Sequence, residues 1–242
     1  MDNVCAVVLA AGKGTRMGST EQNKVTFNIG GQPIIKKVIM VIRSAGIADI
    51  VVVVGFAKES VIALLDDKIL VADQEEALGT GHGVQIALPK VPKKDDQILV
   101  LYGDDAFWFT AEILHNLYQT HIQNQADITF CTTIVEKPAG LGRIIRDESG
   151  RVIDIVEEKV ATNQQKAITE VNLGGFLFNR TFLEKYLNEL PKNPISGEYY
   201  LTDLIPMAAL KGEKIATLKL ENFTWRGINT PAELQEAERL LK

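Results

Sequence analysis

The sequence predicts an α/β fold built on a Rossmann-like sheet, mixed but mostly parallel and flanked by helices. Through about the first 139 residues, short apolar runs typical of strands alternate with helical patterns, and this alternation indicates a mostly parallel sheet. Two of the runs, 51–54 and 98–101, are apolar without polar alternation, as expected when helices cover both faces. With 242 residues, 46% of them hydrophobic, the chain can bury one sizeable core with a smaller lobe beside it.

The first half of the chain supplies most of the expected elements. The strand-like runs are Val4–Leu9, Ile50–Val54, Ile98–Tyr102 and Ile128–Ile134. The helical patterns are Ile34–Ser44, Ser60–Leu65, Gly83–Leu88 and Glu112–Gln123. Gly12 and Asp104 each come just after one of these strands, and parallel sheets bind ligands beyond the carboxyl ends of their strands. We therefore expect Gly12 and Asp104 to face one crevice.

The pattern changes after about residue 140. Arg143–Arg146 and Arg151–Val156, around the turn Glu148-Ser149-Gly150, predict a hairpin, and a polar stretch follows at Ala161–Lys166. Residues Pro231 to Leu241 predict a closing helix, because a proline just inside the first turn is a helix start signal.

Composition excludes several classes of protein. The net charge is −5 and no basic run stands out, which disfavours a nucleic-acid or anionic-membrane surface. The two cysteines, Cys5 and Cys131, each lie in an apolar strand-like stretch, which indicates core packing in a reducing compartment. The first apolar run is far shorter than the ~20 residues of a membrane span and no basic segment precedes it. We expect a cytoplasmic protein that does not bind membranes.

The most informative segment is a glycine-rich turn with two cations, Leu9-Ala10-Ala11-Gly12-Lys13-Gly14-Thr15-Arg16-Met17. Glycines at 12 and 14 let backbone NH groups converge on phosphate oxygens, and Lys13 and Arg16 add full charges. A P-loop would need glycine at Val7, and the dinucleotide fingerprint would need glycine at Met17, so both fail on spacing. On this turn alone, a triphosphate site and a plain strand-to-helix turn are equal alternatives.

Other segments decide between these alternatives. They are Lys24, Gln74-Glu75-Glu76-Ala77-Leu78-Gly79-Thr80-Gly81-His82, Tyr102-Gly103-Asp104, Gly140-Leu141-Gly142-Arg143-Ile144, Glu157, Glu170-Val171-Asn172, Gly197-Glu198-Tyr199-Tyr200-Leu201-Thr202-Asp203 and Gly227-Ile228-Asn229. With the glycine-rich turn, they resemble the sugar-1-phosphate nucleotidylyltransferases. Within that superfamily, the Gly-Thr-Gly-His and Gly-Glu-Tyr-Tyr-x-Thr-Asp segments point to the uridylyltransferase half of the bifunctional bacterial enzyme that makes UDP-N-acetylglucosamine.

The resemblance implies a single domain with the nucleotide-diphospho-sugar transferase fold. Its parts would be a nucleotide-binding half at about 1–139, a sugar-phosphate-binding half at about 140–230 and the closing helix at 231–242. The sequence has no hexapeptide repeats, so we expect no acetyltransferase β-helix domain.

The implied reaction joins UTP and N-acetylglucosamine 1-phosphate, releases pyrophosphate and requires Mg²⁺. The alternatives are the same chemistry with glucose 1-phosphate, dTTP or CTP, and a non-catalytic subunit that senses a nucleotide sugar. The expected partners are these small molecules. The sequence leaves open whether the chain forms a homo-oligomer.

The resemblance also assigns the catalytic residues. The sugar phosphate is already anionic, so catalysis consists of positioning and charge neutralisation. Asp104 and Asn229 would be the Mg²⁺ ligands, Arg16 would hold the leaving pyrophosphate, and Lys24 would neutralise charge near the α-phosphate. Asp105 supports a cation site, because two adjacent carboxylates are tolerable mainly beside a cation.

The nucleotide would contact both backbone and side chains in the first half. The residues implied are Leu9, Ala10, Ala11, Gly12, Lys13, Gly14, Gln74, Gly79, Thr80, Tyr102 and Gly103. The amide of Gln74 offers one donor and one acceptor, which matches the imide edge of uracil or thymine. A flipped amide would match cytosine, so Gln74 by itself leaves CTP open. We interpret His82 as structural.

On the acceptor side, the resemblance assigns Gly142, Glu157 and Asn172 to the sugar hydroxyls and the acetamido group. The cluster Phe107-Trp108-Phe109 indicates packing or an interface rather than a sugar platform.

The sequence departs from the family pattern in three places. Asn23 stands where proline usually precedes the lysine, in a loop that is one residue longer. Asp105-Ala106 replaces an apolar residue and proline, and Leu173 replaces a small hydroxyl residue beside Asn172. We expect the last two departures to touch the sugar side and so to affect the choice of acceptor.

Overall fold

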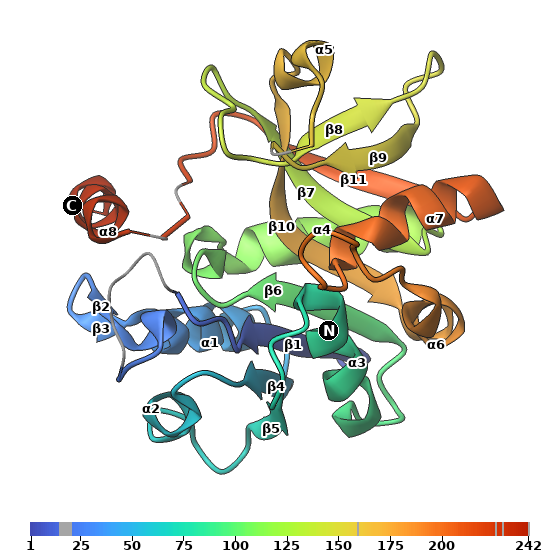
Figure 1. The fold of residues 1–242 in the computed structure, drawn as a ribbon. Helices are drawn as coiled ribbons and strands as arrows, with labels where there is room; N and C mark the ends of the chain where they lie inside the picture. Colours follow the sequence, from blue (N-terminus) through green and yellow to red (C-terminus); the bar gives the residue numbers. More distant parts are fainter. Residues whose placement is uncertain (15–20, 159, 226, 229, 242) are drawn as a thin grey trace.

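The computed structural model of the chain describes residues 1–14, 21–158, 160–225, 227–228 and 230–241. Within these residues, nine strands form one sheet (Figure 1), whose main run has the order β11-β7-β10-β6-β1-β4-β5. The strands of this run are β1 (Val4–Ala10), β4 (Asp49–Val54), β5 (Leu70–Asp73), β6 (Gln97–Tyr102), β7 (Ile128–Ile134), β10 (Glu170–Asn179) and β11 (Ile215–Leu220).

Strands β6, β1, β4 and β5 are mutually parallel, and β11 is parallel to β7. Strand β10 lies antiparallel between β6 and β7. The predicted hairpin is present as β8 (Arg143–Arg146) and β9 (Val152–Val156), and β8 joins the sheet through β10. The predicted fold class, a mixed and mostly parallel α/β sheet, is therefore confirmed.

The helices follow the predicted order and add three that the sequence patterns did not indicate, α5, α6 and α7. Their bounds are α1 (Ile34–Ser44), α2 (Lys58–Ile62), α3 (Thr80–Ala87), α4 (Ala111–Gln123), α5 (Asn163–Lys166), α6 (Arg180–Tyr186), α7 (Leu204–Lys211) and α8 (Pro231–Leu240). Short 3₁₀ helices include η2 (Lys24–Thr26), η4 (Ala106–Trp108) and η6 (Leu201–Asp203), and a small ribbon, β2 (Asn28–Ile29) with β3 (Gln32–Pro33), follows η2.

Local sequence explains where the helices begin and which side they bury. Helix α8 begins at Pro231 because the Thr230 hydroxyl accepts a hydrogen bond from the Glu233 N–H at 3.2 Å. Helix α1 buries one apolar stripe, formed by Ile34, Ile35, Val38, Ile39 and Ile42. Within the described residues, we find no helix with the length and hydropathy of a membrane span.

The sheet separates two layers of core. On β1, Ala6 and Val8 pack in the layer that contains α1 and α4, whereas Cys5 and Val7 pack in the layer that contains α3, α6 and α7. This alternation follows from the two-residue period of a strand. Both cysteines are fully buried and unpaired, as predicted. Helices thus cover both faces and leave the carboxyl edge of β1 and β6 as the open side.

Candidate active site

A cavity of about 640 Å³ lies at this carboxyl edge. Its lining includes eleven residues that the sequence assigned to catalysis or nucleotide binding: Leu9, Ala11, Gly12, Lys13, Gly14, Lys24, Gln74, Gly79, Thr80, Tyr102 and Asp104. Gly12 follows β1 and Asp104 follows β6, and these strands are parallel neighbours. The expected crevice shared by Gly12 and Asp104 is therefore present.

Two predicted nucleotide-binding residues lie behind the cavity wall. Ala10 is buried, and its carbonyl accepts a hydrogen bond from Asn23 at 2.9 Å. The Gly103 N–H donates to the carbonyl of Leu9 at 2.9 Å, and a Cβ atom at Gly103 would come within 2.9 Å of the same oxygen. Gly103 is thus required for the close approach of two chain segments.

Lys24 and Asp104 form an ion pair inside the cavity. Lys24 begins η2, and its side-chain carbons lie 3.2 to 3.4 Å from the position that a Cβ atom would take at Gly14. Glycine at position 14 therefore leaves room for the Lys24 side chain to pass the glycine-rich turn and reach Asp104. Arg16 and Asn229, the other predicted catalytic and metal-binding residues, lie outside the described residues.

Asp105 is buried beside this ion pair and also lines the cavity. Burial raises the pKa of its carboxyl group well above the usual value, the neighbouring Asp104 raises that pKa further, and Lys24 lowers it. Two adjacent carboxylates in a cavity offer the hard oxygen donors that Mg²⁺ prefers.

The orientation of the Gln74 amide follows from its neighbours. Its NH₂ group donates to the carbonyl of Gly79 at 2.9 Å and lies 3.1 Å from Nδ1 of His82. A flipped amide would place two carbonyl oxygens together, so the NH₂ group must face Gly79. The interpretation of His82 as structural agrees with this contact, which holds Gln74 in place.

A segment from the second half of the chain completes the cavity wall. The N–H of Gly81 donates to the carbonyl of Tyr199 at 2.8 Å, and the N–H of Leu201 donates to the hydroxyl of Thr80 at 3.0 Å. These bonds bring Glu198 and Tyr200 into the cavity lining. We assigned no site role to either residue from the sequence, although both belong to the Gly-Glu-Tyr-Tyr-x-Thr-Asp segment that carried the resemblance.

The three predicted sugar-binding residues lie together. A Cβ atom at Gly142 would be 3.4 Å from Oε1 of Glu157 and 3.8 Å from Cβ of Asn172. The Asn172 N–H donates to the carbonyl of Gly142 at 2.9 Å, and the Asn172 side-chain oxygen accepts from the N–H of Gly174 at 2.9 Å. This second bond fixes the carboxamide and leaves its NH₂ group without a partner among the described residues.

A half-buried ion pair stabilises the loop that carries Gly142. The side chain of Arg143 is 1% exposed, and its guanidinium pairs with Glu158 and donates to the carbonyl of Leu141. Glu158 also accepts from the Gly140 N–H at 3.3 Å.

Tyr102 connects the nucleotide cavity to the sugar-side residues. Its ring packs on Gly174, where a Cβ atom would come within 2.7 Å of the ring. Burial raises the pKa of its hydroxyl group, and the charges of Glu157, Asp105 and Asp104 raise it further. Gly142, Glu157 and Asn172 are not part of the cavity lining.

The expectation that Leu173 touches the sugar side is wrong. Leu173 is fully buried in the core layer of α1 and α4, because it points to the opposite side of β10 from Asn172. Ala106 is buried in the same layer. Three residues that depart from the family pattern were expected on the sugar side: Asp105, Ala106 and Leu173. Of these, only Asp105 lines the cavity.

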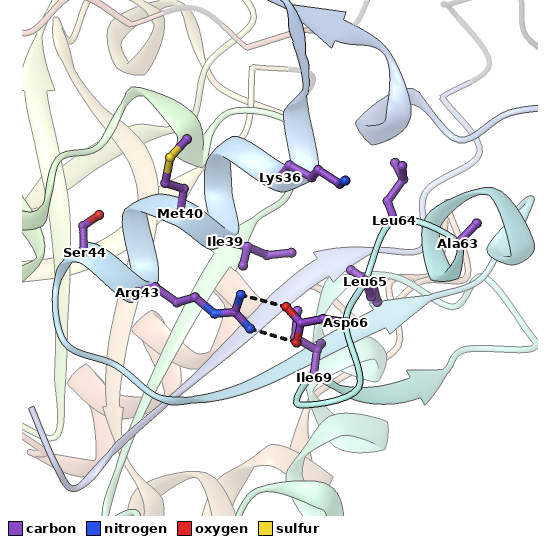
Figure 2. Close-up of a pocket in the computed structure, with 10 residues that line it drawn as sticks. All are labelled: Lys36, Ile39, Met40, Arg43, Ser44, Ala63, Leu64, Leu65, Asp66 and Ile69. Atoms are coloured by element: carbon purple, nitrogen blue, oxygen red, sulfur yellow. Dashed lines mark hydrogen bonds and ion pairs between the residues drawn. The ribbon is translucent and has the colours of Figure 1, made fainter.

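The aromatic cluster after Asp105 packs in the core, as predicted. Phe107 and Phe109 are buried, and the ring of Phe109 stacks on Phe223 with a centroid distance of 5.9 Å. Figure 2 shows a separate cavity of about 650 Å³ between α1 and the segment after α2. Arg43 and Asp66 face each other across it in a two-pronged ion pair, with N–O distances of 2.7 and 2.9 Å, and it contains none of the predicted site residues.

A glycine-rich loop after the first strand of a parallel sheet, with a lysine and an aspartate at one cavity, defines a phosphate-handling α/β protein. The chain belongs to the nucleotidyl transferase family, whose sequence profile matches residues 5–242. The resemblance inferred from the sequence motifs is thereby confirmed at the level of the family.

Relatives of known name match almost the whole chain. It is 41% identical over 238 residues to the bifunctional protein GlmU of Heliobacterium modesticaldum and 40% identical over 238 residues to that of Geobacillus sp. (strain WCH70). Each alignment covers 98% of this chain but only 52% and 51% of the relative, so the chain spans about half their length.

A crystal structure shares the fold. It is a putative glucose-1-phosphate thymidylyltransferase from Bacillus anthracis, with a TM-score of 0.82 at 20% identity, over 98% of this chain and 94% of the other.

Proposed function

We propose that the protein is a uridylyltransferase that joins UTP and N-acetylglucosamine 1-phosphate into UDP-N-acetylglucosamine and releases pyrophosphate. The observation that carries this proposal is the cavity at the carboxyl edge, where the glycine-rich loop, the Lys24–Asp104 ion pair and Gln74 face one space. The family supports nucleotidyl transfer, and the resemblance to the uridylyltransferase half of a bifunctional enzyme supports these two substrates.

In the proposed reaction, a phosphate oxygen of the sugar 1-phosphate forms a bond to the α-phosphorus of UTP. The bond between the α-phosphorus and the bridging oxygen breaks, and pyrophosphate leaves with that electron pair. No general base is needed, because the attacking oxygen is already anionic. The backbone of the loop at Gly12 to Gly14 would bind the phosphates, and Lys24 would neutralise charge at the α-phosphate. Arg16 would hold the leaving pyrophosphate.

The donor set fits a divalent cation. Asp104, assisted by Asn229, would hold Mg²⁺ through its carboxylate. When bound, Mg²⁺ supplies Lewis-acid stabilisation of the charge on the phosphates.

The orientation of Gln74 supports a uracil-type base. With its NH₂ group occupied by Gly79, the side chain offers an acceptor oxygen to the base. Uracil and thymine carry an N–H at the central position of this edge, whereas cytosine carries a bare nitrogen acceptor there. Two acceptors would face each other with CTP, so we propose that UTP or dTTP is used and CTP is rejected.

The sugar side supports an acceptor with an acetamido group. The free NH₂ group of Asn172 can donate to an amide carbonyl, and the carboxylate of Glu157 can accept from sugar hydroxyls. With Leu173 in the core, a departure that we expected to affect the choice of acceptor points away from the side of β10 that carries Asn172.

The test is a pyrophosphate-release screen of UTP, dTTP, CTP, ATP and GTP against N-acetylglucosamine 1-phosphate and glucose 1-phosphate, with Mg²⁺. We expect UTP with N-acetylglucosamine 1-phosphate to give the highest kcat/KM. A site that hydrogen-bonds the acetamido group can reject glucose 1-phosphate by up to ~10⁴-fold. If glucose 1-phosphate is preferred, the transfer reaction stands and the acceptor assignment fails.

Two substitutions separate catalysis from mere binding of a nucleotide sugar. Asp104→Ala and Asn229→Ala should each abolish most turnover while the protein keeps its thermal unfolding transition. Normal turnover of purified Asp104→Ala would overturn the proposed mechanism. If the wild-type protein releases no pyrophosphate with any pair but binds UDP-N-acetylglucosamine, the protein is a nucleotide-sugar sensor instead.

A further inference from the structure

We propose that Asn23 is a positioning residue that holds Lys24 in a fixed place relative to the glycine-rich loop, so that the lysine reaches the triphosphate that the loop binds. This inference rests on the proposed function, because it acts through the role of Lys24. Asn23 is fully buried, lies directly before Lys24 and does not line the cavity.

The carboxamide of Asn23 connects three separate parts of the chain. Its NH₂ group donates to the carbonyls of Ala10 and Phe56, each at 2.9 Å, and to that of Gly12 at 3.3 Å. Ala10 ends β1, Gly12 belongs to the glycine-rich loop, and Phe56 lies just after β4. One side chain therefore ties the loop to the ends of two neighbouring strands.

The same side chain fixes the segment that carries Lys24. The Asn23 Oδ1 atom accepts from the N–H of Val25 at 3.1 Å and so caps η2, and the Asn23 N–H donates to the Ser60 hydroxyl at 3.2 Å. Thr26 closes the turn by donating to the Asn23 carbonyl from its N–H at 3.0 Å and its hydroxyl at 2.8 Å.

Only asparagine meets these requirements in so little space. The position needs two N–H donors for carbonyls and one acceptor for an N–H on a short side chain, and aspartate has no donor. Alanine would leave buried carbonyls without their donor, and such orphaned polar groups are costly. Proline, which the family pattern has here according to the resemblance, provides none of these bonds. Asn23 therefore supplies an anchor that proline could not.

Proline offers a strict test, because the backbone of Asn23 already has a proline-like φ of −71° and ψ of 143°. Asn23→Pro keeps this backbone conformation, removes every hydrogen bond of the side chain and also removes the N–H that donates to Ser60. Asn23→Ala removes the side-chain bonds and keeps this N–H, so it isolates the contribution of the side chain. Thr110→Ala is the matched control, because Thr110 also caps a helix, α4, from outside the cavity.

The readout is kcat and KM for UTP and the acceptor, measured well below each variant's unfolding temperature. Asn23→Pro and Asn23→Ala should lower kcat by about 10²-fold, the usual cost of a misplacement of about 1 Å at a reacting centre, with a much smaller change in KM. Thr110→Ala should lower the unfolding temperature and leave kcat unchanged. Wild-type kcat in Asn23→Pro would overturn the proposal.

A double variant shows whether Asn23 acts through Lys24. If it does, adding Asn23→Ala to Lys24→Ala should lower kcat by less than about threefold, because the position of an absent lysine no longer matters. If the two losses multiply, Asn23 acts independently of Lys24 and the proposal fails. Failure of the proposed function would appear separately, as the absence of wild-type turnover or as full activity of Asp104→Ala.

Discussion

Lys24 and Asp104, which are 80 residues apart in the chain, form an ion pair in which their side chains are only 16% and 18% exposed. The lysine comes from the 3₁₀ helix after the glycine-rich loop, and the aspartate follows the neighbouring parallel strand. The pair brings a cation and an oxygen donor to the same wall of the cavity. A bound nucleotide phosphate would compete for Lys24, and its metal ion would compete for Asp104.

We predict that Lys24 cannot be replaced by arginine. Lys24→Ala should lower kcat by about 10² to 10³-fold, the range for removal of one stabilising donor from a reacting centre. Lys24→Arg keeps the charge but presents a planar fork on a different stem, so it should recover only a small part of the loss. Steady-state kinetics with UTP measures both variants, and wild-type kcat in Lys24→Arg would contradict the point-charge role.

Gly79 should be more sensitive to alanine than a glycine with a similar φ elsewhere. Gly79 has a φ of +96° and Gly31 a φ of +80°, so alanine is strained at both, by about 1 kcal/mol or more. Only at Gly79 does the new Cβ atom meet an obstacle, the Tyr199 carbonyl at 2.6 Å.

Gly79→Ala should therefore lower the free energy of unfolding more than Gly31→Ala and raise the KM for UTP. Denaturant unfolding and initial rates measure the two effects. Equal losses of stability in both variants would show that the backbone angle alone matters.

The two thiols should not react in the native protein. Burial raises the pKa of Cys5 and of Cys131 to about 12, and the thiolate is the reactive form. At pH 8, a thiol reagent such as dithionitrobenzoate should label neither cysteine before unfolding and both after it in denaturant. Rapid labelling of one thiol in the native state would contradict the burial of that residue.

His121 should make the protein less stable in mild acid. Its ring is buried, Nδ1 lies 2.8 Å from the Thr129 hydroxyl, and Nε2 lies 3.2 Å from Oδ1 of Asn179. Burial lowers the pKa of His121, against smaller opposing effects of Asn179 and Asp127. The unfolded chain therefore binds a proton near pH 6.5 that the folded protein does not bind until lower pH, so stability falls as the pH drops below about 6.5.

His121→Gln removes this proton and keeps polar groups near Thr129. The stability advantage of the wild type over this variant should be constant from pH 7.5 to 8.5 and shrink below pH 6.5, by at most about 1.4 kcal/mol per pH unit. Chemical denaturation across this range measures it. A difference that does not change with pH would mean that the folded protein protonates His121 normally.

Patterns within single strands and helices were enough to predict the first half of the fold. Strands β1, β4 and β6 lie within one residue of the predicted runs, because strands buried on both faces are continuous apolar segments. Strand β10 was not predicted, since Gly174 and Gly175, both at positive φ, interrupt it with a bulge. Strand β11 is half-exposed at the edge of the sheet, and β5 has four residues, so neither has a clear pattern.

The part of the site that follows from the topology of parallel strands could be predicted from the sequence. The meeting of Gly12 and Asp104 follows from two strands that end at the same edge. The contribution of Glu198 and Tyr200 depends on hydrogen bonds between residues 199–201 and 78–81, which no local pattern reveals. Leu173 was misplaced because the strand that carries it, and so the alternation of its faces, was not predicted.

The position of β10 has a consequence for the synthesis of the protein. Phe176 pairs with Val100 of β6 on one side and with Phe130 of β7 on the other, so β6 and β7 do not pair with each other. Until residue 170 and those after it leave the ribosome, both strands present unpaired inner edges, which are sites for misassociation between chains. We therefore expect the nascent chain to depend on chaperones through the synthesis of this stretch, and truncations before β10 to aggregate.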